Sequence, residues 1–381
     1  MAGARCSGVM TARGLLRVAL LGAASCTAMA ATAAPANRAG ETAVRPAPGL
    51  AVARAAHTAT LLGDGTLLVA GGCTGDSCEL DSRGTTTEVF QPKSGRFTPG
   101  PRLPAPMVGH SATRLADGKV LLAGGWDDEG LTERAYLYDP GSRTFAATGS
   151  MQAARGGFTA TRLRDGRVLF AGGSSNGAPL RSAELYDRAS GRFIRTGSMT
   201  TARIGHVAAT LGGGRILVAG GSGAGGRVLA GAELYDPRTG TFSKTGDMRF
   251  ARHKHAAAPT AGGRILVVGG SDANDFRGRY ASAELYDPAS GRFRPVRPMA
   301  QRRFKLPDAV VGLGSGAVLV AGGAPSVERY DNGSRTFRTV GRLGVELLLS
   351  TATLLPDGRV LIAGGYDERI RVSGRAWLYR P

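Results

Sequence analysis

Short apolar runs that end in a pair of glycines recur along the chain. In residues 120–125, for example, the run reads Val-Leu-Leu-Ala-Gly-Gly. The first glycine of the pair falls at residues 71, 124, 172, 220, 269, 322 and 364. Because turn-forming residues flank these runs, each run is predicted to be a short β-strand.

A second pattern, similar to Ala-Glu-Leu-Tyr-Asp-Pro, follows each glycine pair. Its aromatic residues are Phe90, Tyr138, Tyr186, Tyr235, Tyr286, Tyr330 and Tyr379. Seven residues after each of the first six aromatics stands a phenylalanine, from Phe97 to Phe337. Each unit of about 49 residues therefore predicts four short strands, which we name A to D in chain order.

Tight turns are predicted between strands A and B. Asp-Gly, a strong hairpin signal, occurs there in four units, at residues 64–65, 117–118, 165–166 and 357–358. Strand B ends in the glycine pair, strand C carries Glu-Leu-Tyr-Asp, and strand D carries the phenylalanine. Four-stranded units that repeat at this period predict a β-propeller.

The unit resembles the kelch repeat in its glycine pair, its Glu-Leu-Tyr-Asp-Pro segment, the aromatic residue of strand D and the Met-x-x-x-Arg start of the next unit. The resemblance covers about residues 42–381 and implies an all-β, seven-bladed β-propeller of four-stranded kelch blades, as in galactose oxidase-like proteins. The chain departs from the family where phenylalanine replaces the usual tryptophan of strand D. It departs again where Tyr136 and Trp377 replace the glutamate of strand C.

The ends of the repeated region predict how the ring closes. The seventh unit ends at Pro381 without a strand D. Val44 and Leu50 match the spacing between the phenylalanine of strand D and the methionine that follows it in other units. Residues 42–48 are therefore predicted to supply the outer strand of the last blade, which leaves no open sheet edge.

The first thirty residues have the layout of a secretory signal peptide. Arg5, Arg13 and Arg17 precede an apolar stretch at 18–28, and small residues follow it. We expect a signal peptide at 1–30, a linker at 31–41 and the propeller at 42–381, in a protein exported to the periplasm or the extracellular medium. No other long apolar run occurs, so no membrane span is expected after cleavage.

Charge and cysteine content describe the exported chain. The net charge of the whole chain is +19, and residues 31–381 still carry 45 basic against 29 acidic side chains, a net charge of +16. Cys73 and Cys78 are the cysteines that remain, and in an oxidising compartment they predict a disulfide. Half of a metal site is the alternative, but no second cysteine or histidine pair completes it. No metal or cofactor is expected.

The two faces of the predicted ring differ in the lengths of their connections. The A–B and C–D turns are short and nearly constant, whereas the B–C connections on the other face vary in length. Variable loops on a rigid scaffold commonly bind ligands, so this face is predicted to be functional. Simple tolerance of insertions is the alternative.

Arginines recur on the variable face at the start of strand A. They are Arg54, Arg155, Arg203, Arg252 and Arg303. Guanidinium groups suit carboxylate, sulfate and phosphate, so these five are candidate ligand-binding residues that ring the mouth of the channel. They resemble arginines that bind acidic peptides in kelch adaptors of ubiquitin ligases. The other interpretation is structural, with each arginine paired to an acid of a neighbouring blade or packed on the core.

Histidines recur three residues after the arginine position. They are His57, His110, His206 and His255. Their periodicity favours packing between blades over metal binding. Acidic residues of the variable loops, such as Asp127 and Asp275, match no calcium loop and are expected to be solvated.

These observations favour a non-enzymatic binding module for an anionic glycan, an acidic peptide or an envelope polymer on the variable face. The alternative is a periplasmic or secreted carbohydrate-acting enzyme, because exported bacterial kelch propellers include a sialic acid mutarotase; no catalytic residue is matched to it. Galactose oxidase chemistry is not expected, since its copper site needs residues from outside the propeller. Nucleic acid is not an expected partner, because the chain lacks an aromatic and basic strip for stacking bases.

Overall fold

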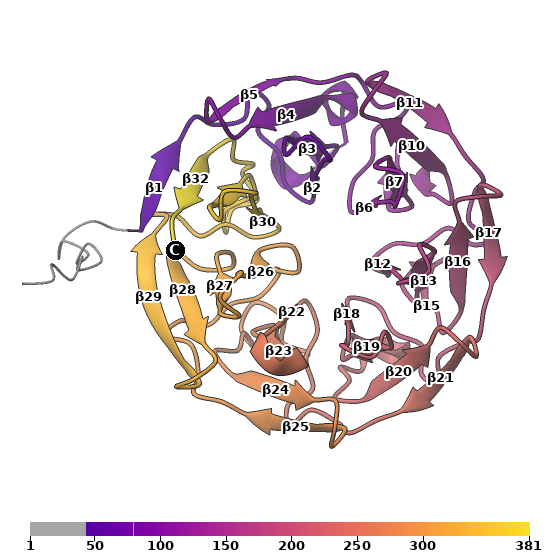
Figure 1. Cartoon of the computed structure of the whole chain (residues 1–381), viewed down its shortest axis with the longest axis vertical. Helices are drawn as coiled ribbons and strands as arrows, with labels where there is room; N and C mark the ends of the chain where they lie inside the picture. Colours follow the sequence, from indigo (N-terminus) through magenta and orange to yellow (C-terminus); the bar gives the residue numbers. More distant parts are fainter. Residues whose placement is uncertain (1–42, 79) are drawn as a thin grey trace, which may run out of the picture. The chain divides into compact units, whose positions relative to one another are not determined.

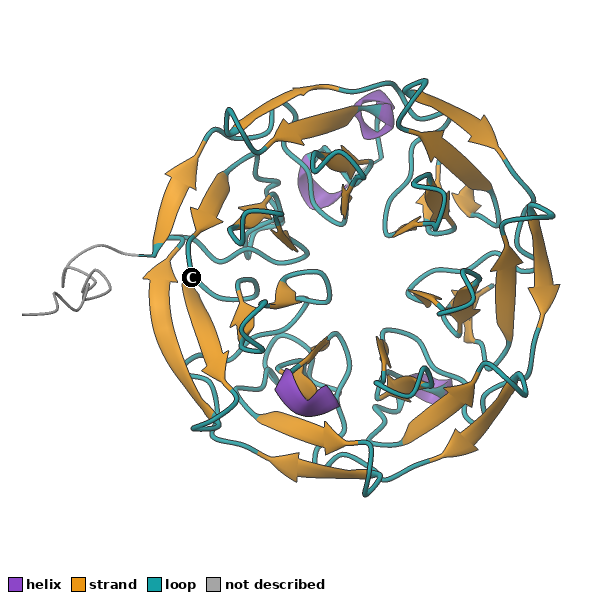
Figure 2. Cartoon of the chain, in the orientation of Figure 1, coloured by secondary structure: helices purple, strands orange, loops and turns teal. Residues whose placement is uncertain are grey.

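The computed structural model describes residues 43–78 and 80–381. The predicted signal peptide (1–30) and linker (31–41) lie outside the described residues. The propeller unit, Thr42–Pro381, contains seven four-stranded antiparallel sheets arranged in a ring, as predicted (Figures 1 and 2). Nearly all of its regular structure is β-strand, and the described helices are short 3-10 turns.

Each blade takes its strands in chain order from the inside to the outside. Blade 1 has β2 (Thr58–Leu61), β3 (Leu67–Ala70), β4 (Thr87–Gln91) and β5 (Arg96–Pro99). Blade 2 has β6 (Ser111–Arg114), β7 (Val120–Ala123), β10 (Ala135–Asp139) and β11 (Thr144–Ala147). Blade 3 has β12 (Thr159–Arg162), β13 (Val168–Ala171), β16 (Ala183–Asp187) and β17 (Arg192–Arg195). Blade 4 has β18 (Val207–Thr210), β19 (Ile216–Ala219), β20 (Ala232–Asp236) and β21 (Thr241–Lys244).

The other three blades repeat this order, except that the last takes its outer strand from the start of the propeller. Blade 5 has β22 (Ala256–Pro259), β23 (Ile265–Val268), β24 (Ala283–Asp287) and β25 (Arg292–Pro295). Blade 6 has β26 (Val310–Gly312), β27 (Val318–Val320), β28 (Ser326–Asp331) and β29 (Thr336–Arg342). Blade 7 has β30 (Thr351–Leu354), β31 (Val360–Ala363), β32 (Ala376–Tyr379) and β1 (Val44–Ala47).

Small elements decorate the loops between strands B and C and one A–B turn. Two-stranded hairpins are formed by β8 (Trp126–Asp127) with β9 (Gly130–Leu131), and by β14 (Ser174–Ser175) with β15 (Ala178–Pro179). The 3-10 turns are η1 (Asp76–Cys78), η2 (Ser82–Thr85), η3 (Ala224–Gly226) and η4 (Ala261–Gly263). No helix in the described ranges is long and apolar enough to cross a membrane.

The repeated residues explain how neighbouring blades pack. Gly71 of blade 1 has φ +63°, and a Cβ atom there would lie only 2.7 Å from the Cε1 atom of His110 in blade 2. A glycine is therefore required both by the backbone conformation and by the close approach of the next blade. His110 is buried and shares a hydrogen bond of 3.0 Å with Thr58 of blade 1. The repeated histidines thus lie at blade contacts.

The aromatic pair of each blade fixes the outer sheet. In blade 1, Phe90 of β4 lies directly opposite Phe97 of β5, and their ring centroids are 5.0 Å apart. The same contact joins Tyr186 to Phe193 in blade 3, at 4.9 Å. The seven-residue spacing in the sequence is thus the spacing of a cross-strand pair.

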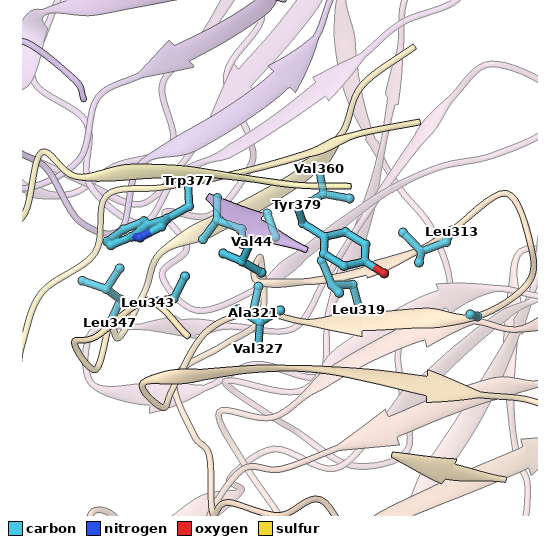
Figure 3. Close-up of a cluster of buried hydrophobic side chains, with 13 residues drawn as sticks. Val44, Leu313, Leu319, Ala321, Val327, Leu343, Leu347, Val360, Trp377 and Tyr379 are labelled. Atoms are coloured by element: carbon cyan, nitrogen blue, oxygen red, sulfur yellow. The ribbon is translucent and has the colours of Figure 1, made fainter. Parts of the chain in front are cut away.

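The ring closes at blade 7, as predicted. Strand β1 pairs antiparallel with β32, and Val44 lies opposite Tyr379. Val44 is buried with Leu343, Trp377 and Tyr379 in the apolar cluster between blades 6 and 7 (Figure 3). The first and last strands of the propeller therefore share one sheet and one core, and the ring is closed by the pairing of the N-terminal strand β1 with the C-terminal strand β32.

Candidate binding faces

The five predicted ligand-binding arginines are buried inside the blades. Arg155 is representative, because its side chain is 1% exposed and its Nη2 atom lies 2.7 Å from Oε1 of Glu184, which is 2% exposed. Its Nη1 atom donates to the carbonyl oxygens of Gly172, at 2.8 Å, and Ser182, at 3.1 Å. The guanidinium group therefore joins the start of strand A to the glycine pair and to strand C.

The same ion pair recurs in four other blades. The distances are 3.4 Å for Arg54–Glu88, 2.8 Å for Arg203–Glu233, 3.0 Å for Arg252–Glu284 and 2.8 Å for Arg303–Glu328. In blade 3, the second carboxylate oxygen of Glu184 accepts the backbone N–H of Gln152 at 2.7 Å. We call these five pairs the arginine–glutamate ladder.

This placement corrects the expectation of an arginine ring at the channel mouth. The guanidinium groups of the ladder donate their hydrogen bonds to acceptors inside the blade and are buried. They are therefore not accessible to a ligand. Burial lowers the pKa of Arg252, and the neighbouring Glu284 opposes that shift. The burial agrees with the structural interpretation, in which each arginine pairs with an acid or packs on the core. The acid comes from the same blade, however, and not from a neighbouring blade.

Two blades replace the whole pair with apolar residues. Met107 and Tyr136 stand at the arginine and glutamate positions of blade 2, and both are buried in one apolar cluster. Leu347 and Trp377 do the same in blade 7. Arginine and glutamate are therefore present together or absent together. This pairing was visible in the sequence and identifies the arginines as structural.

The loop face, which carries the B–C and D–A connections, has a ring of residues with left-handed backbone, each two positions after the repeat position that holds the ladder arginine in five blades and Met107 or Leu347 in the other two. They are Ala56, Gly109, Gly157, Gly205, Lys254, Lys305 and Leu349. Backbone hydrogen bonds connect this ring between blades, for example from Lys305 N to Lys254 O at 2.9 Å and from Leu349 N to Lys305 O at 2.8 Å. Lys254 and Lys305 each have φ +52°, a conformation that costs a non-glycine residue free energy and is common at functional sites.

Charged and aromatic side chains gather on the loop face of blades 5 to 7. Nζ of Lys254 lies 2.8 Å from Oδ2 of Asp275, and Nζ of Lys305 donates to the hydroxyl of Tyr366 at 2.8 Å. His253 lies in the same group, with Nδ1 2.9 Å from Ser222 Oγ. Burial lowers the pKa of His253, and the Lys254 ammonium group adds to that shift. We call this group the loop-face cluster.

Aromatic rings border the loop-face cluster. Phe276 is 41% exposed, and its ring centroid lies 5.8 Å from that of Phe304. The guanidinium carbon of Arg279 lies 4.0 Å from the Phe276 ring centroid, and Nζ of Lys305 lies 5.4 Å from that of Phe304. Positive charge thus lies over aromatic faces, an arrangement that stabilises it.

A hollow of about 520 Å³ lies on the loop face between blades 6 and 7. It is lined by Pro325, Gly344, Val345, Glu346, Asp367, Glu368, Arg369 and Arg371. Burial raises the pKa of Glu346, and the Glu368 carboxyl group beside it raises the pKa further, whereas Arg279 lowers it. Nη1 of Arg279 donates to Oε1 of Glu346 at 2.8 Å. The B–C connection of blade 6 is short, which leaves this space open.

Cys73 and Cys78 form a disulfide in the structure, the pairing expected from the sequence. Cys73 is buried next to Ala55 of the loop-face ring region, and each accepts the other's backbone N–H, at 2.9 and 3.0 Å. The bond therefore anchors the B–C loop of blade 1 to the inner part of the loop face.

Comparison with known proteins identifies similar sequences and structures. The kelch motif matches residues 203–249 and 252–300. A solved fungal alcohol oxidase of the AA5 family, in complex with copper, aligns with a TM-score of 0.69 and 18% identity, over 89% of this chain and 75% of that chain. At this identity the likeness concerns the fold alone. No curated protein sequence matches the chain significantly.

The copper of that oxidase does not fit the donors found here. Among the residues that the structure describes, no group of three or more histidine, cysteine, aspartate or glutamate side chains is placed to hold a metal ion. The two matched motifs correspond to blades 4 and 5, and the other five blades repeat the same glycine pairs and cross-strand aromatics. The chain is a seven-bladed β-propeller whose blades 4 and 5 match the kelch motif.

Proposed function

We propose that this propeller is an exported binding module that holds an anionic glycan on its loop face, over blades 5 to 7. The observation that carries the proposal is the environment of Lys305. Its ammonium group donates to the neutral Tyr366 hydroxyl and forms no ion pair with any carboxylate in the described residues. The nearby Asp275 is already paired with Lys254. The Lys305 charge contributes to the lowered pKa of Asp275, but Lys305 is held in place without a salt bridge of its own.

The surroundings of Lys305 favour a sugar over a peptide. The exposed Phe276 ring offers an apolar surface for the C–H face of a pyranose. Glu346 and Glu368 in the adjoining hollow offer acceptors for hydroxyl groups. A few fixed polar groups beside aromatic surface are the usual composition of a small-molecule site. In this proposal the Lys305 ammonium group binds the acidic group of the ligand, and the carboxylates of Glu346 and Glu368 accept hydrogen bonds from its hydroxyl groups.

Ligand titration tests this proposal. Sialic acid, uronates, sulfated sugars, neutral sugars and acidic peptides are titrated calorimetrically, at low and moderate salt, against the full chain and Lys305→Met. Acidic sugars are expected to bind to the full chain. Lys305→Met is expected to lower their affinity at least about tenfold, which corresponds to ~1.4 kcal/mol of binding free energy. Lys93→Met removes one exposed lysine from a C–D turn on the opposite face and serves as the matched control. Equal affinities for all three proteins, or binding by acidic peptides alone, contradict the proposal.

A second candidate function is a carbohydrate-acting enzyme of the sialic acid mutarotase kind. The pairing of Glu346 with Glu368 favours it, because a carboxyl group with a raised pKa next to a second carboxylate is suited to general acid–base catalysis. The test is the rate of anomer exchange of sialic acid and uronates, followed by NMR. Faster anomer exchange with the wild-type protein that is lost in Glu346→Gln supports an enzyme. If the protein does not raise the exchange rate above the spontaneous rate, the binding module is the supported function.

A further inference from the structure

The turn face, which carries the A–B and C–D turns, contains a repeated ion pair. In blade 3 the turn residue Asp165 accepts the backbone N–H of Arg167 at 3.0 Å and its Nε at 2.9 Å. In blade 7, Asp357 holds Arg359 in the same way, with 3.0 and 2.8 Å. An aspartate and the basic residue two positions later therefore form one unit in these A–B turns.

Blades 4 and 5 keep the arginine of this unit but lack the aspartate, and of the two arginines Arg215 of blade 4 is the exposed one. The blade-4 turn reads Gly212-Gly213-Gly214-Arg215, so Gly213 stands at the position of Asp165. Arg215 is exposed, whereas Arg167 and Arg359 are partly buried. Arg167 also donates to the carbonyl oxygen of Pro237 in the next blade, at 3.5 Å. Within the described ranges, Arg215 forms no salt bridge and no such hydrogen bond to a carbonyl oxygen, although its charge helps to lower the pKa of Asp236, which is paired with Arg238.

A hollow of about 470 Å³ lies over this glycine turn, between blades 3 and 4. It is lined by Arg164, Asp165, Gly213, Gly214, Arg215, Asp236, Pro237 and Arg238. The two aspartates are already neutralised, because Asp165 is paired with Arg167 at 2.7 Å and Asp236 with Arg238 at 3.0 Å. The surplus charge of the hollow is therefore positive and belongs to Arg164 and Arg215.

Arg164 strengthens this surplus. Its side chain lies across the blade-4 turn and donates to the carbonyl oxygen of Gly212, a neutral acceptor. That contact holds the guanidinium group at the blade-4 turn without cancelling its charge. Two guanidinium groups near one vacant acceptor position suit an oxyanion, since their planar donor sets match the geometry of such groups.

We infer that this hollow binds an oxyanion group of a ligand, a carboxylate, sulfate or phosphate, in place of the aspartate that blade 4 lacks. The repeat itself supplies the template, because Asp165 and Asp357 show where an acidic group sits against the same arginine. The site lies on the face opposite the loop-face cluster and does not depend on the function proposed there.

Restoring the missing aspartate tests the inference. Gly213→Asp completes the turn unit; no atom lies within 4 Å of a Cβ at this position, and the backbone there is not left-handed. Ser315→Asp adds the same charge at the matching position of blade 6, where Ala317 replaces the arginine, and is the control for net charge. The probe is hydroxypyrene trisulfonate, followed by fluorescence anisotropy with the full chain carrying Lys305→Met, so that the loop face does not contribute.

The probe is expected to bind and to be displaced by sulfate, phosphate or galacturonate. Gly213→Asp and Arg215→Met are each expected to lower the affinity for the probe at least about tenfold. Ser315→Asp is expected to change that affinity less than about twofold, because distant surface charges are screened. Displacement by galacturonate more than by sulfate or phosphate identifies a carboxylate ligand. Absence of saturable binding, equal weakening by the two aspartates, or no effect of Gly213→Asp overturns the inference. Thermal unfolding of each variant confirms that the fold is retained.

Discussion

The ladder arginines and the arginine of the blade-4 turn occupy equally regular positions in the repeat but differ in their partners. Arg155 lies 2.7 Å from a buried glutamate that recurs with it, and where the arginine is missing the glutamate is missing too. Arg215 keeps a repeated position whose aspartate has been lost. A repeated arginine with a repeated acid is therefore structural, whereas Arg215, which lacks the acid and is exposed beside a hollow, is available to a ligand.

The loop face shows the same contrast with lysines. Lys254 is paired with Asp275 at 2.8 Å, whereas Lys305 in the next blade donates only to a neutral hydroxyl. Both lysines have the same left-handed backbone, so the difference is not one of position. The presence or absence of a local acid separates cations that hold the fold together from cations that can receive a ligand.

The largest expected effect comes from breaking the ladder. Arg155→Ala leaves Glu184 buried without its partner, and we expect the free energy of unfolding to fall by about 3–5 kcal/mol. The double substitution Arg155→Met with Glu184→Tyr copies blade 2, and it is expected to lose less than Arg155→Ala. Urea unfolding measures both. A double variant less stable than the single one would show that the pairing in blades 2 and 7 has no structural meaning.

A smaller effect is expected from acid. Burial, followed by the charge of Arg203, lowers the pKa of His206 from 6.5 to about 3. Between these pH values the unfolded chain binds a proton that the folded chain does not, so stability is lost as the pH falls, by up to about 1.4 kcal/mol per pH unit. His206→Phe copies Phe158, the residue at this position in blade 3. The variant should lose less stability than wild type between pH 6.5 and 4; an identical loss would place the sensitive group elsewhere.

The smallest effect is expected on the turn face. Asp165 and Arg167 are 43% and 37% exposed, so their ion pair is largely solvated. Asp165→Ala is expected to lower the free energy of unfolding by about 1 kcal/mol or less. A loss as large as that of Arg155→Ala would remove the distinction between the buried ladder and the exposed turn units.

The fold was predictable because the repeat is long and regular. The glycine pairs, the seven-residue aromatic spacing and the match of Val44 to strand D gave seven blades and their closure, and the structure confirms both. Spacing shows which residues share a repeat position, but not whether a side chain points into the blade or into solvent. For that reason the ladder arginines were assigned to the channel mouth, although the joint loss of arginine and glutamate in blades 2 and 7 was a signal against it.

The binding faces were less predictable for a different reason. The hollow beside Glu346 depends on how the loops of blades 6 and 7 fold against each other, and loop conformation is not periodic. Lys305 stood at a repeat position without a marked partner in the sequence, since its contact with Tyr366 joins two neighbouring blades through non-periodic loop residues. The turn-face site was only partly marked in the sequence, because an arginine without the turn aspartate occurs in blade 4 (Gly213, Arg215) and also in blade 5 (Gly262, Arg264), and only the structure shows the hollow in blade 4.

One comparison tests the central claim most directly: the affinity of an acidic sugar for the full chain, for Lys305→Met and for the double variant Arg155→Met with Glu184→Tyr. If the ladder is structural and the loop-face cluster binds the ligand, the double variant binds like wild type and Lys305→Met binds at least about tenfold more weakly. If the folded double variant loses binding while Lys305→Met retains it, the ladder arginines are ligand-binding residues and the account is wrong.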